Sequence, residues 1–138
     1  MRSLPKTKAT SSPTVQVSWG ELLDKITILE IKQQRLKSED AAANARRELE
    51  ALINVAGGVL SQLPDVASLK RQLSSVNEAL WDIEDKIRAK EAAKSFDQQF
   101  IDLARSVYVN NDKRGALKRQ INALLHSELV EEKQYTPY

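Results

Sequence analysis

The strongest pattern in this sequence is a heptad seam between residues 66 and 87. Seven apolar residues alternate spacings of three and four without a miss: Val66, Leu69, Leu73, Val76, Leu80, Ile83 and Ile87. That spacing keeps the side chains on one side of an α-helix, as in helices that pack in pairs. The pattern predicts a helix that begins after the segment LPD and needs at least one helical partner.

A second seam follows it in the sequence. Its members keep one register throughout: Phe96, Phe100, Leu103, Val107, Asn110, Arg114, Leu117, Ile121 and Leu124. A capping-box pattern of Ser95 and Gln98 predicts the start of this helix at Ser95. Because short connections make successive helices antiparallel neighbours, the two seams predict a hairpin. The polar members leave two alternatives open, a continuous helix or a break at Asn110–Asp112 with Asn111 or Asp112 capping a fourth helix.

The first helix is predicted to begin at Ser18, where Ser18 and Glu21 form another capping box, and to end at Gly57-Gly58. Its main apolar face changes sides near Ser38–Asp40. Either the helix breaks there, with Ser38 as the new cap, or its first half packs on both sides. An unbroken helix over 18–56 is about 58 Å long and extends past the hairpin turn, where its own chain does not cover it. We therefore expect a homodimer through Leu22–Ile31, which supplies Leu22, Leu23, Ile26, Ile28, Leu29 and Ile31.

Only four glycines and four prolines occur in 138 residues. The scarcity of these helix breakers and the two seams predict an all-α protein. The expected architecture is an antiparallel helical hairpin within a bundle of three, possibly four, helices. We expect one domain over 15–135, a disordered basic tail over 1–14 and a C-terminal tail over 136–138. The absence of cysteine excludes disulfides and thiolate catalysis and favours a cytoplasmic location. The single histidine, His126, argues against histidine metal sites and Ser–His–Asp triads.

The charge pattern gives no indication of nucleic-acid binding. The formal net charge is +2, and no aromatic residues interleave with the basic run Lys113, Arg114, Lys118 and Arg119. We interpret this run as a solvated helix face. The chain also has no segment apolar and long enough to span a bilayer.

Arg114 is the sharpest candidate for a binding residue, because it occupies a seam position. A guanidinium there needs a partner, and Glu78 is the expected one because it has no base in its own helix. The alternative is an anion site in which Arg114, Arg105 or Lys113 binds a carboxylate or phosphate. The ligand-binding candidates are Arg105, Asn110, Lys113, Arg114, Asn77 and Trp81.

Five acidic residues are candidate metal ligands. Glu78, Asp82 and Asp85 stack on one side of their helix, and the first helix adds Glu21 and Asp24. Carboxylates on a helix face are ligands that Mg²⁺ accepts. The competing interpretation is a solvated stripe, with Asp82 paired to Lys86 and Glu21 acting as a cap.

Four segments together carry a resemblance to a known family: VSWGELLDKITILEIK, VNEALWDIEDKIR, LARSVYVNNDKRGALKRQIN and SELVEEKQY. They resemble a small bacterial family of short helical proteins with no assigned function, over roughly Val15 to Tyr135. The resemblance implies no activity, cofactor or binding residue. The two acidic motifs, Glu21/Asp24 and Glu78/Asp82/Asp85, are also reminiscent of all-helical nucleotide pyrophosphohydrolases, although the spacing within each motif departs from that family's pattern.

The sequence contains no recognisable pairing of a nucleophile with a base. It favours a non-catalytic protein without a cofactor that homodimerises and binds another protein or a small anionic ligand. The alternative is a Mg²⁺-dependent all-helical phosphohydrolase acting on a nucleotide or sugar nucleotide.

Overall fold

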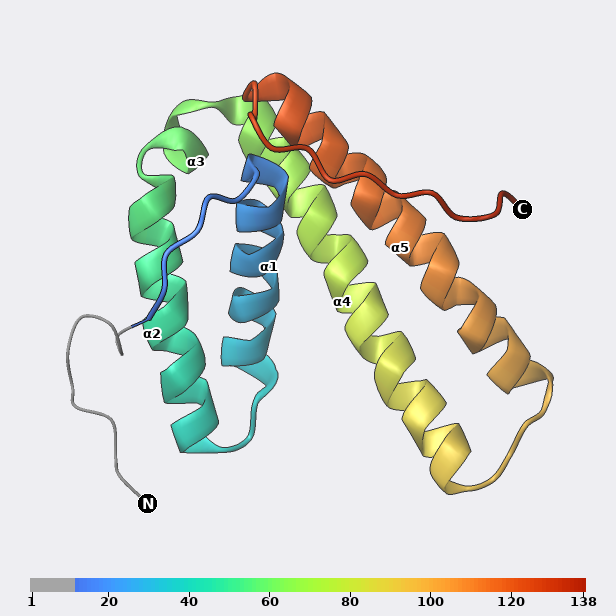
Figure 1. Ribbon diagram of the computed structural model, residues 1–138. Helices are drawn as coiled ribbons and strands as arrows, with labels where there is room; N and C mark the ends of the chain where they lie inside the picture. The colour runs from blue at the N-terminus through green and yellow to red at the C-terminus, as the bar shows by residue number, and fades with distance from the viewer. Residues whose placement is uncertain (1–11) are drawn as a thin grey trace, which may run out of the picture.

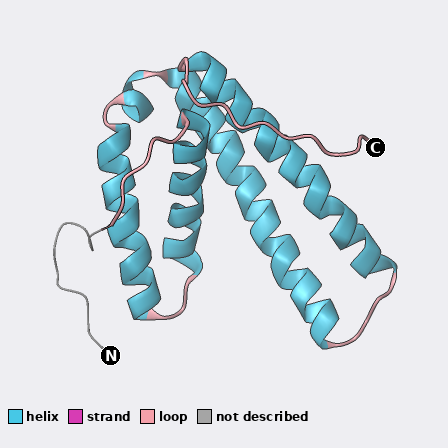
Figure 2. Ribbon diagram, in the orientation of Figure 1, coloured by secondary structure: helices cyan, strands magenta, loops and turns pink. Residues whose placement is uncertain are grey.

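The computed structural model describes residues 12–138, and every regular element in that range is a helix (Figure 2). The prediction of an all-α protein is therefore confirmed. The helices are α1 (Trp19–Arg35), α2 (Glu39–Ala56), the single turn α3 (Val59–Gln62), α4 (Pro64–Ala92) and α5 (Gln98–Leu124). None of them is long and apolar enough to cross a membrane.

Two antiparallel helical hairpins make up the molecule, α1–α2 and α4–α5, with α3 in the connection between them (Figure 1). Helix α1 packs against α2 on one side and against both α4 and α5 on the other. The two hairpins diverge away from the end that holds the start of α1. Since α1 ends at Arg35, which reaches Asp82, the part of α4 beyond Asp82 extends past the last turn of α1.

The first apolar segment breaks near Ser38, as one of the two alternatives predicted. The Ser38 hydroxyl accepts a hydrogen bond from the Ala41 amide at 3.3 Å and caps α2. Helix α2 then folds back along α1, so the straight helix of 18–56 does not form. Helix α2 ends at Gly57, as predicted for this segment. The φ of +59° at Gly57 lies in the left-handed region that glycine adopts without strain.

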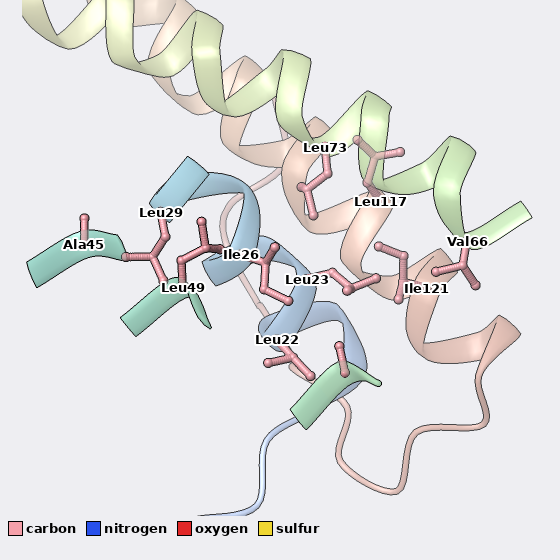
Figure 3. Close-up of a cluster of buried hydrophobic side chains, with 11 residues drawn as sticks. Leu22, Leu23, Ile26, Leu29, Ala45, Leu49, Val66, Leu73, Leu117 and Ile121 are labelled. Carbon is pink, nitrogen blue, oxygen red and sulfur yellow. The ribbon is translucent and has the colours of Figure 1, made fainter. Parts of the chain in front are cut away.

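The core forms around α1 (Figure 3). Leu29 meets Ala45 and Leu49 of α2, while Leu23 points toward Ile121, near Val66 and Leu73. The predicted dimer surface, Leu22–Ile31, is therefore largely enclosed by its own chain: apart from Ile28, its apolar residues are at most 4% exposed. The expectation that nothing in the chain covers it was wrong, because α2 folds back and the other hairpin covers the opposite side.

The α4–α5 hairpin forms as the seams predict, with corrections at its ends. Helix α5 is continuous through Asn110–Asp112. It begins at Gln98 rather than Ser95, because the Asp97 carboxylate accepts the Phe100 amide at 3.0 Å and is the cap. Helix α4 begins at Pro64, whose missing amide hydrogen costs nothing in the first turn.

Burial along the hairpin decreases with distance from α1. Val66 and Leu73 of α4 are fully buried, whereas Leu80, Ile83 and Ile87 are half-buried. On α5, Ile121 is fully buried, and Phe96 is 56% exposed. Among residues 12–138, the outer half of the hairpin thus has a single helix–helix interface and no third helix packed on it.

The C-terminal segment has no regular secondary structure. Residues 127–138 run back along α5 (Figure 1). Most of the basic tail predicted for 1–14 lies outside the described residues.

Candidate binding cleft between the hairpins

The start of α1 is fixed by residues near the other end of the sequence. The Trp19 amide donates to the Ser127 hydroxyl at 3.0 Å, and the Gly20 amide donates to Asn122 Oδ1 at 2.7 Å. Ser18 accepts the Glu21 amide at 3.1 Å, as its capping pattern predicted. These acceptors satisfy the free amides of the first turn and hold α1 against α5.

A buried carboxylate lies where α1, α4 and α5 meet. Asp24 is 1% exposed and accepts hydrogen bonds from Arg114 Nε at 2.9 Å, from Arg114 Nη2 and from Asn77 Nδ2 at 2.9 Å. Asn77 also donates to the Thr27 hydroxyl at 2.9 Å. The hydrogen bond to Asp24 raises the pKa of Arg114 above its usual value. Arg114 therefore stays charged and neutralises Asp24 in a two-pronged pair.

This pair corrects the prediction that Arg114 bonds to Glu78. Glu78 is exposed, whereas Asp24 comes from α1, which lies against both helices of the second hairpin. Arg114 also retains 29% exposure of its side chain, so it is half-buried.

One turn further along α5, Lys118 forms a second buried link. Its ammonium lies 2.8 Å from Glu21 of α1 and 2.6 Å from Glu131 of the C-terminal segment. Burial alone would lower the pKa of Lys118, but the hydrogen bonds to Glu131 and Glu21 outweigh it and raise the pKa. The bond to Lys118 holds the pKa of Glu131 below its usual value. Lys118 thus ties α1 and the C-terminal segment to α5.

Beside the Asp24–Arg114 pair lies a cleft of about 490 Å³. Helix α1 gives it Ile28 and Ile31. The second hairpin gives it Asn77, Leu80, Trp81, Glu84, Asp85 and Arg88 from α4 and Val107, Asn111 and Arg114 from α5. We call this the inner cleft. Its volume lies within the range of about 300–1,000 Å³ found for ligand sites, and its walls are mainly apolar.

Trp81 is held in the inner cleft by the end of α1. The guanidinium carbon of Arg35 lies 5.9 Å from the centre of the Trp81 ring, and Arg35 also pairs with Asp82. That hydrogen bond raises the pKa of Arg35 and lowers the pKa of Asp82. The indole is half-buried, so an aromatic surface is both positioned and accessible.

A family model matches residues 13–138, nearly the whole chain and its C-terminal segment included. The chain belongs to DUF6165, a family of unknown function. No curated protein and no solved structure matches it. Family membership therefore leaves the function to be argued from the site.

Three of the six predicted ligand-binding residues come together in the inner cleft of this family member: Asn77, Trp81 and Arg114. The other three do not line it. Arg105 and Lys113 are exposed elsewhere on α5, and Asn110 donates to the Ser106 carbonyl of its own helix at 2.8 Å.

The structure does not assemble the five predicted metal ligands. Asp24, Glu21 and Asp82 are engaged by Arg114, Lys118 and Arg35, respectively. Glu78 and Asp85 are exposed on α4, and Asp85 lies at the rim of the inner cleft. Within residues 12–138, no group of three or more acidic, histidine or cysteine side chains is arranged to hold a metal ion.

The sequence interpretation missed Lys118, which was assigned to a solvated face and is 5% exposed. A signal for it was present. Glu21 and Asp24 are three residues apart on one helix, and Arg114 and Lys118 are four apart on another, so each pair shares a face. Matching the two pairs across the helices would have indicated both buried links.

Proposed function

We propose that this protein is a non-catalytic binding protein that receives a helix of a partner protein in the inner cleft. The observation that supports the proposal is the outer half of the α4–α5 hairpin, where apolar seam residues remain half-exposed beside a positioned tryptophan. A third helix packed on this outer half would continue the layer that α1 forms over the inner half of the same hairpin. Helix-in-groove recognition commonly takes this form, and tryptophan is enriched among residues that dominate binding energy.

Helical geometry supports a continuous docking surface. Phe100, Val107 and Arg114 are spaced by seven residues and lie on one side of α5, the side that Arg114 turns toward α1. Trp81 and Arg88 have the same spacing on α4. The surface that α1 covers near Arg114 therefore continues outward along both helices.

The electrostatics favour a protein helix over the small anionic ligand that was the other expectation. Arg114 is neutralised by Asp24, and the carboxylates of Glu21 and Glu131 also act on it. An anion at this end would meet three acidic groups around one guanidinium and the neighbouring Lys118. A wall whose centre is apolar and whose α4 edge carries Glu84 and Asp85 suits the packed side chains of a helix better than an anion.

The side chains around the cleft support a binding role rather than catalysis. Asp24, Asn77 and Thr27 bond to one another or to Arg114, and the bonds of Asp24 join α1 to both α4 and α5. The placement of the acids lends no support to the Mg²⁺-dependent alternative. We propose that the protein works without a cofactor, in the cytoplasm.

Homodimerisation is part of the proposal only in a changed form. Because Leu22–Ile31 is enclosed, a second copy would use the inner cleft and the outer hairpin instead. Sedimentation velocity of the purified protein measures whether it dimerises.

Site-directed photocross-linking in the producing cells tests the function. A photoreactive residue replaces Trp81 in one variant and Val55, which is 68% exposed on α2, in the control. We expect a discrete cross-linked protein from position 81 that is absent from position 55. A synthetic peptide of its cross-linked helix should bind the purified protein, and Trp81→Ala should weaken binding at least about tenfold.

Cross-links common to both positions, or a peptide whose affinity is unchanged by Trp81→Ala, would contradict the proposal. A cross-link between two copies of this chain at position 81 identifies the partner as a second copy.

A further inference from the structure

We infer that the partner helix is basic, an amphipathic helix with lysine or arginine beside its apolar stripe. This inference rests on the proposed function and specifies the partner's chemistry. It comes from the uneven distribution of charge on the two helices that form the outer part of the docking surface.

The α4 edge of this surface is acidic. Glu84 and Asp85 line the inner cleft, and Glu91 follows Glu84 by seven residues, on the same side of the helix. Arg88 is the one base among them, and it pairs with Glu84 at 3.4 Å. Asp85 takes part in none of the ion pairs between described residues. Three carboxylates against one guanidinium leave this edge with a net charge of −2.

The α5 edge carries no compensating charge. Its residues on the same side are Phe100, Val107 and Asn111, which are apolar or neutral, and Arg114, whose charge Asp24 neutralises. The surface therefore has an apolar centre, an acidic edge and a neutral edge. A helix whose apolar face covers Trp81 and Val107 would place one polar flank against Glu84, Asp85 and Glu91, and bases on that flank complement them.

Two synthetic probe helices of about 15–18 residues distinguish the possibilities, a length at which a helix gains stability from the surface it covers. Both carry the same leucine stripe, and one has lysine flanks where the other has glutamate. Binding is followed by the indole N–H signals in NMR spectra. The chain has two tryptophans, so Trp81 reports on the cleft and Trp19, at the start of α1, is the internal control.

We expect the lysine helix to move the Trp81 signal and to leave the Trp19 signal in place. It should bind at least about fivefold more tightly than the glutamate helix, because two or three exposed ion pairs supply a difference in affinity of that size. The double variant E84Q/D85N brings the net charge of the edge to zero and should remove the difference. The control E48Q/E50Q removes two exposed acids from α2 and should preserve it.

Equal affinity of the two probes at Trp81 would overturn the basic-partner inference and leave the binding cleft in place. If neither probe moves the Trp81 signal, the proposed function itself fails. A shift of Trp81 by inorganic phosphate, without a response to either helix, would assign the cleft to a small anion and overturn both.

Discussion

Replacing Arg114 by alanine should be strongly destabilising, because it strands the carboxylate of Asp24. That carboxylate is 1% exposed and receives two of its three side-chain hydrogen bonds from Arg114. Removing one partner of a buried pair costs about 3–5 kcal/mol. Asn77 still donates one bond to Asp24, so we expect the lower end, a loss of about 3 kcal/mol. The total stability of a domain is only about 5–15 kcal/mol.

The two partners should not be equally sensitive. Asp24→Asn leaves a guanidinium that is 29% exposed and can be hydrated, so we expect a loss of about 1–2 kcal/mol. In the double variant D24L/R114M no charge is left buried, and its unfolding free energy should return close to the wild-type value. Arg88→Ala is the matched control, because Arg88 is 80% exposed and pairs only with Glu84. It should leave the unfolding free energy unchanged within error.

Urea unfolding followed by circular dichroism measures these differences. With a slope of about 2 kcal/mol per molar urea, Arg114→Ala should lower the midpoint by about 1.5 M. A decrease below about 0.25 M would show that Asp24 is hydrated and the pair is superficial. A larger loss for Asp24→Asn than for Arg114→Ala would equally refute the reasoning.

Two further predictions concern α5 and the segments that contact it. Gly20→Ala should destabilise the protein by about 1–3 kcal/mol in urea unfolding, because the added Cβ would lie 2.5 Å from the Lys118 carbonyl oxygen. Gly115→Ala is the control. Its added Cβ would meet no atom outside its own helix nearer than 3.7 Å, so the protein should gain about 0.5–1 kcal/mol from helix propensity. The link from Glu131 to Lys118 should persist from neutral pH down to the unfolded pKa of a glutamate, about 4.3, and be lost as the pH falls through the lowered pKa of Glu131. Heteronuclear NOE values of residues 129–138 should then fall, and the Glu131→Gln variant should show the low values already at pH 7. Values that stay high in that variant would show that Tyr138 and its bond to Asp112 suffice to hold the C-terminal segment on α5.

The sequence predicted the α4–α5 hairpin well because its information is local. Apolar spacing fixes which side of each helix is buried, and Asn110 and Arg114 did not break α5, since a polar residue in a seam changes its partner and not the backbone. The start of α5 was misplaced because Ser95 and Asp97 are both good caps. Their competition is decided by the turn, in which the Ser95 amide still bonds to the Lys90 carbonyl of α4.

The tertiary contacts were predicted less well, because they depend on the direction in which α1 continues. The Ser38 break was one of two alternatives, and local pattern does not state that the chain folds back there. That one turn decides whether Leu22–Ile31 faces solvent or its own α2. The seam position of Arg114 indicated that it needs an acidic partner. The choice between Glu78 and Asp24 depends on how α1 packs against α5, and Asp24 is 90 residues away from Arg114 in the sequence.

The long sequence separation of the contacts around α1 has a consequence for synthesis on the ribosome. The amides of Trp19 and Gly20 find their acceptors 108 and 102 residues later, and Asp24 finds its guanidinium 90 residues later. Helix α1 leaves the ribosome before α5, yet its buried carboxylate cannot be neutralised by Arg114 until α5 has been made. The nascent α1–α2 hairpin must therefore keep Asp24 hydrated, and α1 packs in its final position only after α5 has emerged from the ribosome.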